Sequence, residues 1–287
     1  MRRIIINADD FGLTQGVNRA VIELHRSGVL SSATLMANAS ATNEAIHFAL
    51  KTPGLGVGCH VVLVDGTPVL PARDIPTLID PATGQFHRKL TTFLRLLLMG
   101  RIQASEIEAE TSAQIAQIAE KRLHLTHIDT HKHTHIFPAV LRPVLRAARA
   151  AGVSAVRNPF EPPWSRQATP AAPLVRRVEV NLLHQLEPAF RRILVQEGFK
   201  TTDGAIGVLA TGSLDAETVD SLLQNIPDGT WELVTHPGYN DTDLARVNTK
   251  LTESRSIERL ALMQVGRHSG LDLVSFAALN PTGTPGI

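Results

Sequence analysis

The stretch Arg3-Ile4-Ile5-Ile6-Asn7-Ala8-Asp9-Asp10-Phe11-Gly12 opens with an apolar run and closes with two adjacent carboxylates. The apolar part, residues 3–8, is typical of a buried strand. Two carboxylates side by side repel each other, so burying both without a cation or a proton is costly. A metal ion removes this cost if one Asp binds it and the other accepts a proton from water. Taken alone, the motif still favours a solvated turn in which an Asp caps the next helix.

Around this stretch, short β-rich runs alternate with helical stretches, which predicts parallel βα units. Strands are predicted at residues 3–8, 32–38, 55–64, 125–131, 154–157, 205–209, 231–235 and 272–276. Helices are predicted at residues 15–26, 43–51, 91–98, 105–122, 139–151, 174–195 (interrupted near Pro188), 216–224 and 253–268. We interpret this as an α/β protein, a single deformed (β/α) TIM-like barrel with about seven parallel strands.

The length of 287 residues fits one such domain. We expect it to span residues 1–287, with excursions at about 65–90 and 158–200. The first excursion is rich in Pro, Asp and Gly, which is typical of a lid or binding loop. Within the second, residues 174–194 carry apolar side chains with interspersed arginines. This pattern favours a packed helix over a lid or a helix at a membrane surface.

Composition narrows the classes of partner and compartment. The chain has 28 Lys and Arg against 27 Asp and Glu, so no basic excess favours nucleic acid. Its single cysteine cannot form an intrachain disulfide, which fits a reducing compartment. No secretory signal fits the start, and the longest candidate for a membrane span, at about 94–99, is far too short. We therefore expect a cytoplasmic protein without a nucleic-acid partner.

The strongest chemical signal is the run Thr126-His127-Ile128-Asp129-Thr130-His131-Lys132-His133-Thr134-His135. Its four histidines and one aspartate occupy odd positions, so an extended strand would point them to one face. Each needs a polar partner if buried, and histidine is the commonest metal ligand. With a rise of ~3.3 Å per residue, the two ends lie roughly 26 Å apart. One or two members are therefore expected to bind a metal, while the others orient ligands or contact substrate. A histidine-rich loop that binds metal adventitiously is the alternative.

Two further histidines lie late in predicted strands, in Gly58-Cys59-His60 and Thr235-His236-Pro237-Gly238. Either one alone fits an ordinary packed strand residue or a surface turn. The carboxyl ends of parallel barrel strands converge on one mouth. We therefore predict one shared site from the strand ends that carry Asp9 and Asp10, His60, His131 and His236.

Together these motifs resemble the YdjC-like carbohydrate deacetylases, which include chito-oligosaccharide deacetylases. The matching elements are the Asn7–Gly12 segment, Gly-x-His at His60, the histidine-rich run and His236-Pro237-Gly238, and they span most of the chain. Residues 68–71 and 75–80 further resemble the branch associated with hopanoid biosynthesis. Cys59 departs from the apolar residue that is usual in the family, and we expect its side chain to face away from His60.

The resemblance implies a deformed barrel with one divalent metal ion, bound by Asp10, His60 and His131. It further implies that Asp9 is the catalytic base and His236 the acid. A metal-activated water would then attack the amide of an N-acetylated amino sugar. This substrate is expected to be a chito-oligosaccharide or an N-acetylglucosaminyl hopanoid, which is a glycolipid.

The remaining polar residues of the site receive supporting roles. Arg157 matches a position expected to contact substrate. His127 and Asp129 are expected to orient the ligands by hydrogen bonds, and His133 and His135 to contact substrate or ligands. An Asp/His/His set suits Zn²⁺, Co²⁺ or Ni²⁺ better than Mg²⁺, although Mg²⁺ is also proposed for this family.

Two other functions stay open from the sequence. A metal-dependent phosphoesterase on a related barrel also uses His-x-His motifs, although we would expect them at the first strand. A non-catalytic metal-dependent sugar-binding protein does not need the second carboxylate, Asp9. The expected partner is an N-acetylated sugar or glycolipid, with peripheral membrane contact through residues 174–194 as a further hypothesis. The oligomeric state is not indicated by the sequence.

Overall fold

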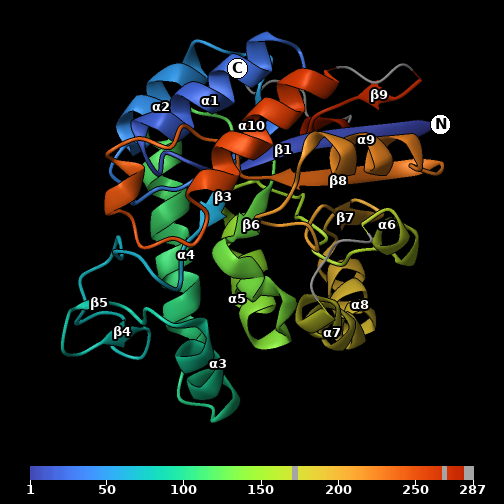
Figure 1. The fold of residues 1–287 in the computed structure, drawn as a ribbon. Helices are drawn as coiled ribbons and strands as arrows, with labels where there is room; N and C mark the ends of the chain where they lie inside the picture. The colour runs from blue at the N-terminus through green and yellow to red at the C-terminus, as the bar shows by residue number, and fades with distance from the viewer. Residues whose placement is uncertain (170–173, 267–269, 281–287) are drawn as a thin grey trace.

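The parallel sheet of the protein forms a half-barrel in the computed structural model, which describes residues 1–169, 174–266 and 270–280 (Figure 1). Its seven strands are all parallel, in the order β6-β3-β2-β1-β8-β7, and β9 pairs with the start of β1. The strands are β1 (Arg2–Phe11), β2 (Ser32–Leu35), β3 (Gly56–Val61), β6 (Ile128–Thr130), β7 (Gly204–Ile206), β8 (Gly229–Thr235) and β9 (Asp272–Leu273). The predicted α/β class with about seven parallel strands is confirmed.

The sheet of this deformed barrel is not closed, because β6 and β7 are the outer strands of the sheet in the described residues. The strand predicted at 154–157 makes only isolated bridges, Ile128 with Val156 and Ala155 with Lys200. Beyond Arg157 this segment keeps one backbone hydrogen bond to β7, from the Ala205 N–H to the Phe160 carbonyl oxygen at 3.2 Å, without forming a continuous ladder. Pro159 has no N–H group to donate, and the Asn158 side chain accepts the N–H of Phe160 at 3.2 Å.

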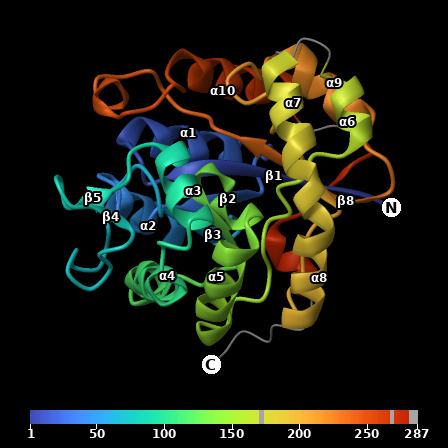
Figure 2. The ribbon, with the colours of Figure 1, turned by 90° about the horizontal axis from the view of Figure 1, so that it is seen from below.

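The helices surround the sheet. One group of contacting helices is α9, α10, α1 and α2, and a second is α4, α5 and α8 (Figures 1 and 2). The described α-helices are α1 (Gln15–Arg26), α2 (Thr42–Leu50), α3 (Leu90–Leu98), α4 (Ala104–Ala119), α5 (Pro138–Ala150), α6 (Pro163–Gln167), α7 (Leu174–Leu183), α8 (Glu187–Glu197), α9 (Ala216–Gln224) and α10 (Glu253–Val265).

Capping residues explain why two helices match their predicted bounds. The Thr14 side chain accepts the N–H of Val17 at the start of α1, and Asp215 accepts that of Thr218 at the start of α9. The interruption expected near Pro188 separates α7 from α8. Residues 267–268 of the last predicted helix lie outside the described residues.

The first excursion is held against α4 rather than against the sheet. It contains the two-stranded hairpin β4 (Ile79–Asp80) and β5 (Gln85–Phe86), which lies away from the sheet in Figure 1. Glu106 of α4 accepts the N–H of Thr77 at 2.8 Å, and Glu110, one turn later, accepts those of Val69 and Leu70 at 2.8 and 3.0 Å. These two carboxylates therefore fix the base of the excursion.

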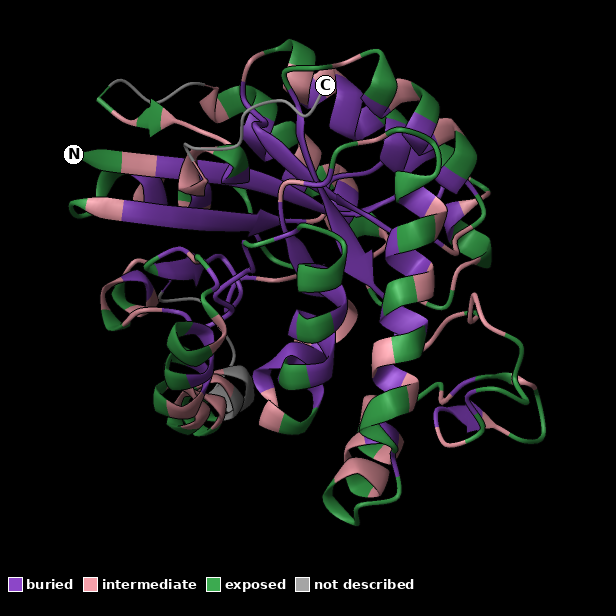
Figure 3. Cartoon of the chain, turned by 180° about the vertical axis from the view of Figure 1, so that it is seen from behind, coloured by how far each residue is buried: buried purple, intermediate pink, exposed green. Residues whose placement is uncertain are grey.

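The alternation of side chains along the strands separates an apolar face from a polar one. Residues on the helix-facing side belong to the main hydrophobic core: Ile4, Ile6, Ala8, Ala33, Leu35, Val57, Cys59, Val61, Ile128, Val156, Ile206, Trp231 and Leu233. Cys59 thus packs on the side opposite His60, as expected. Residues of the opposite face are also buried, as Figure 3 shows for the sheet as a whole, yet many are polar: Asn7, Asp9, Ser32, Thr34, His60, His127, Asp129, Arg157 and Glu232.

Candidate metal centre and active site

A backbone irregularity lets two neighbouring carboxylates reach the same site. Successive side chains of a regular strand point to opposite faces, which would separate Asp9 from Asp10. Asp10 instead has a left-handed φ of 62°, and the β1–β2 register shifts between Ala8 and Phe11. Such a conformation is costly for a non-glycine residue and is concentrated at functional sites.

Asp10, His60 and His131 form a compact triad. Asp10 Oδ1 lies 3.4 Å from His60 Nε2 and 3.3 Å from His131 Nδ1, and the two ring nitrogens are 3.2 Å apart. Tetrahedral coordination with zinc-ligand bonds of about 2.0–2.1 Å separates ligand atoms by roughly 3.3–3.4 Å. Octahedral Mg²⁺ at similar bond lengths would separate neighbouring ligands by only about 2.9 Å. Asp10 Oδ1 is also buried without a hydrogen-bond partner. The triad therefore fits a divalent cation, and its spacing matches a tetrahedral ion better.

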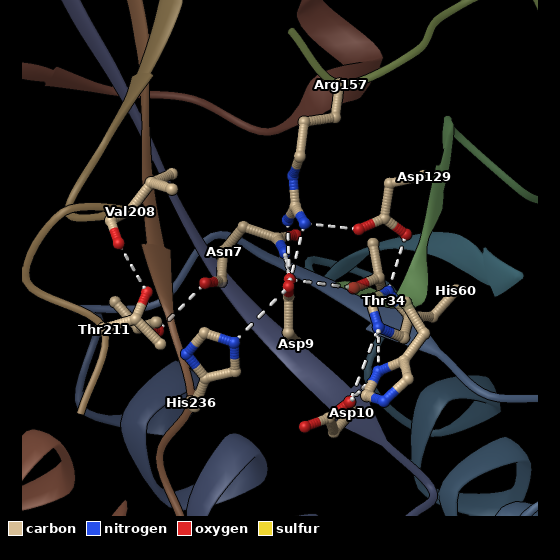
Figure 4. Close-up of polar contacts among 12 residues, drawn as sticks. Asn7, Asp9, Asp10, Thr34, His60, Asp129, Arg157, Val208, Thr211 and His236 are labelled. Atoms are coloured by element: carbon tan, nitrogen blue, oxygen red, sulfur yellow. Dashed lines mark hydrogen bonds and ion pairs between the residues drawn. The ribbon is translucent and has the colours of Figure 1, made fainter. Parts of the chain in front are cut away.

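The second nitrogen of His60 is held by Asp129. Its Nδ1 lies 2.8 Å from Asp129 Oδ1, which orients the ring so that Nε2 faces the other two members of the triad (Figure 4). Burial alone would lower the pKa of His60, but Asp129, Asp10 and Asp9 raise it to about 10. The surroundings of this ring therefore favour a positive charge.

A second cluster, Asp9, His60 and Asp129, also has ligand atoms close together. In this cluster, however, the His60 atom nearest Asp129 is Nδ1, which is engaged in a hydrogen bond. The guanidinium of Arg157 donates to both carboxylates. An ion here would have to displace that buried cation, so the cluster is not a second metal site.

Arg157 is the central buried cation of the site. Its side chain has 0% exposure, and it donates to both oxygens of Asp9 at 2.6 and 2.8 Å and to Asp129 (Figure 4). It also donates to Glu232 Oε1 at 2.7 and 2.9 Å. Burial disfavours this charge, but Asp129, Asp9 and Glu232 outweigh burial and hold the pKa of Arg157 well above its usual value. The side chain expected to contact substrate is therefore fully engaged inside the protein.

Asp9 faces His236 on the side away from His60. Burial would raise the pKa of Asp9, but Arg157, His60 and His236 outweigh burial and hold the pKa well below its usual range. His236 Nε2 lies 3.7 Å from Asp9 Oδ2. Burial lowers the pKa of His236 to about 4, although Asp9 and Asp10 oppose this shift. Near neutral pH the pair is therefore a carboxylate beside a neutral imidazole.

The other histidines of the run lie apart from the triad, and His133 and His135 do so because the extended strand predicted through residue 131 ends at Thr130. Residues His131–Ile136 form a 3-10 turn in which Lys132 and His133 have φ values of 58° and 51°. The alternation rule therefore fails beyond Asp129. His127 stacks on the Phe276 ring, with centroids 3.7 Å apart.

His133 and His135 also differ from each other. The Nδ1 atom of His133 is buried without a hydrogen-bond partner among the described residues. His135 is satisfied, because Nδ1 lies 2.7 Å from Thr130 Oγ1 and Nε2 lies 3.3 Å from the Arg157 carbonyl oxygen. It packs behind the site and supports the backbone of Arg157.

Three site residues were missed by sequence reasoning: Glu232, Arg255 and Glu258. Burial raises the pKa of Glu232 to about 7 despite Arg157. Glu258 Oε2 accepts the backbone N–H of His236 at 2.6 Å, and Arg255 donates to Asp10. A charged residue within the apolar run 231–234 was an available signal for Glu232. The spacing of Arg255 and Glu258, one helical turn apart, was an available signal for a shared inward face.

Comparison with known proteins agrees with this architecture. Residues 3–269 match the model of the family described as YdjC-like protein. A carbohydrate deacetylase of Brevibacillus brevis is 31% identical over 96% of this chain and 99% of its own length, and one of Thermoanaerobacter pseudethanolicus is 27% identical over 97% and 100%. A crystal structure from Enterococcus faecalis V583, of a candidate cellobiose-phosphate cleavage protein, has a TM-score of 0.73 at 24% identity and covers 97% of this chain and 98% of its own. This last similarity establishes the fold.

Proposed function

The chain belongs to the YdjC-like protein family, and on this premise we propose that it is a metal-dependent deacetylase that removes the acetyl group from an N-acetylated amino sugar. The observation that carries the proposal is the placement of a metal-binding triad next to a carboxylate–imidazole pair. The triad uses Asp10 and the pair uses the preceding residue, Asp9. A protein that only binds sugar would not need the carboxylate–imidazole pair beside the triad.

Asp10, His60 and His131 would hold the ion. When bound, a divalent metal polarises the acetamide carbonyl and acidifies a water molecule. Three protein ligands are the usual number in catalytic zinc sites. The donor set of one carboxylate and two imidazoles, together with the ligand spacing, supports zinc or a metal of similar geometry over magnesium.

Asp9 is the base in this proposal. Its carboxylate stays ionised because Arg157 pairs with both oxygens, and Asn7 and Thr34 donate to Oδ1 at 2.9 and 3.1 Å. These contacts hold the group in one orientation. It accepts a proton from the water that adds to the acetamide carbon. Asp9 therefore serves as a fixed acceptor, and Arg157 acts by positioning it rather than by touching substrate.

His236 then acts on the leaving group. It is neutral near neutral pH, so it must first receive a proton, and Asp9 Oδ2 lies 3.7 Å from its Nε2. The proton taken from water passes through this pair to the amine nitrogen as the carbon–nitrogen bond breaks. The products are acetate and the free amino sugar. Glu258 holds the backbone of His236 in place for this transfer.

Acetate release that depends on a metal is the result that tests the function. With N,N′-diacetylchitobiose as probe, we expect chelation followed by buffer exchange to lower acetate release by about 10²-fold or more, since metal polarisation is worth several kcal/mol. Added Zn²⁺ should restore it. Aryl phosphate, offered in parallel, should release no phosphate. Phosphate release that responds to metal, without acetate release, would instead favour the phosphoesterase.

We propose more specifically that the substrate is a glycolipid, such as an acetylated glucosaminyl hopanoid. The exposed apolar side chains of α7 support this proposal. Val178 and Leu182 lie one turn apart on this helix and are 59% and 71% exposed. The packed helix favoured from the sequence matches α8, where Phe190, Ile193 and Leu194 are buried, and also the end of α7, where Leu183 packs against the core. The burial of Leu174 and Val175 lies outside what the structure describes. No described helix is both long and apolar enough to cross a bilayer.

Vesicle co-sedimentation tests whether α7 meets a membrane surface. We expect the protein to sediment with vesicles that contain phosphatidylglycerol, because exposed apolar side chains and the exposed Arg192 favour an anionic interface. The double change Val178→Ser and Leu182→Ser should weaken binding by about tenfold or more. Leu98→Ser, at an 80% exposed position on α3, should leave it unchanged. Absence of binding by the unmodified protein would remove the membrane contact from the proposal.

A further inference from the structure

Arg255 is a second buried arginine of the site, and its environment differs from that of Arg157. It lies in the first turn of α10 with 1% exposure. Its Nη2 donates to Asp10 Oδ2 at 2.5 Å, and its Nε donates to the Leu251 carbonyl oxygen at 3.0 Å. Its aliphatic part lies close to Gly238, where an added Cβ would be 3.1 Å from Arg255 Cδ. The guanidinium is therefore held on the helix side and presented to one carboxylate.

The contact leaves the other oxygen of Asp10 for the two histidines of the triad. Oδ2 is occupied by Arg255, whereas Oδ1 faces His60 and His131 and has no hydrogen-bond partner. Asp10 is also the residue with the left-handed backbone at the end of β1. Because it has left the regular strand geometry, the direction of its side chain depends on a contact from another element.

We propose that Arg255 is the positioning residue that restricts Asp10 to a single ligand oxygen for a divalent cation. The inference rests on the proposed metal site. Nη1 of Arg255 is buried without a partner among the described residues, so the side chain donates through Nη2, to Asp10, and through Nε, to the Leu251 carbonyl oxygen. Its hydrogen bond to a carboxylate is the one to Asp10, while its charge also acts on the buried Glu258 one turn along α10.

The charge of Arg255 and its orienting contact to Asp10 change the metal affinity in opposite directions, so a measurement of affinity can distinguish the two roles. As a positive charge it repels an incoming cation, so a role through charge alone predicts tighter binding when the charge is removed. As an outer partner that orients a ligand, its loss typically weakens metal affinity by about 10- to 100-fold. The orienting role predicts weaker binding, because the Asp10 carboxylate would then be free to rotate.

Zn²⁺ affinity, measured by competition with a chromophoric chelator, is the test. We expect Arg255→Met to weaken binding by about 10- to 100-fold. Arg255→Lys, which keeps the charge but loses the Nε–H that bonds the Leu251 carbonyl oxygen, should weaken it as well. Arg259→Met is the matched control, because this arginine lies one turn further along α10 and pairs with Glu23. The Zn²⁺ affinity of the Arg259→Met protein should equal that of the unmodified protein. Circular dichroism establishes which variants are folded.

Each outcome decides one question. Unchanged or tighter Zn²⁺ binding by either folded Arg255 variant would overturn the inference. His131→Ala, which removes a proposed ligand, should lose most affinity and serves as the reference for the site itself. If the unmodified protein binds no Zn²⁺, or if His131→Ala binds as well as it does, the proposed metal site fails, and this result is distinct from failure of the Arg255 inference.

Discussion

Replacing Asp9 by Asn is expected to lower acetate release by about 10²–10⁴-fold, the range that a positioned general base contributes. The amide keeps the size of the carboxyl group but cannot accept the proton from water. Metal content should remain close to that of the unmodified protein, since Asp9 is not a member of the triad. Steady-state acetate release, together with metal analysis of the same preparation, measures both quantities.

The control for this variant is Asp228→Asn, which changes an exposed aspartate that pairs with the N-terminus. It should leave acetate release unchanged. Full activity of a folded, metal-loaded Asp9→Asn protein would remove Asp9 from the mechanism. Loss of bound metal along with activity would indicate that Asp9 is a ligand, and the assignment of Asp9 and Asp10 would have to be exchanged.

Arg157→Met is expected to destabilise the protein by about 3–5 kcal/mol, the cost of leaving buried charge without its partner. The guanidinium is the buried cation that Asp9, Asp129 and Glu232 share, and all three carboxylates are fully buried or nearly so. Methionine has a similar length but offers no N–H group and no charge. Denaturant unfolding followed by circular dichroism measures the free energy of unfolding.

Arg142→Met is the matched comparison. Arg142 pairs with Glu197 at 3.5 Å, but its side chain is 45% exposed, so the change should cost no more than about 1 kcal/mol. A folded Arg157→Met protein whose free energy of unfolding equals that of Arg142→Met would show that the three carboxylates do not depend on this cation. The network would then have to be protonated in the native state.

Much of the fold was predictable because its signals are local. The apolar run at residues 3–8 and the capped helix that follows it at Gln15 need only neighbouring residues to be recognised. The strand ends were predictable for the same reason, and since parallel strands place their carboxyl ends at one edge, the convergence of Asp10, His60 and His131 could be expected. The membership in the YdjC-like family, expected from these motifs, is confirmed.

The histidine run shows where such reasoning stops. Alternation of odd positions holds only while the chain is paired in a sheet, and β6 pairs with β3 for just three residues, His60 with Asp129 being the middle pair. Beyond Thr130 the chain turns, so His131 reaches the triad from a 3-10 turn while His135 packs behind Arg157. The extent of a strand depends on its neighbours, which the local pattern does not contain.

By itself, the sequence determined which chemical groups stand at the ends of the strands, because periodicity and turn residues act over a few positions. Only the tertiary structure decided which charge neutralises which. Arg157 meets Asp9 across 148 residues and Arg255 meets Asp10 across 245. Buried ions must be paired wherever the chain can bring a partner, and the identity of that partner follows from the packing of whole elements rather than from spacing along the chain.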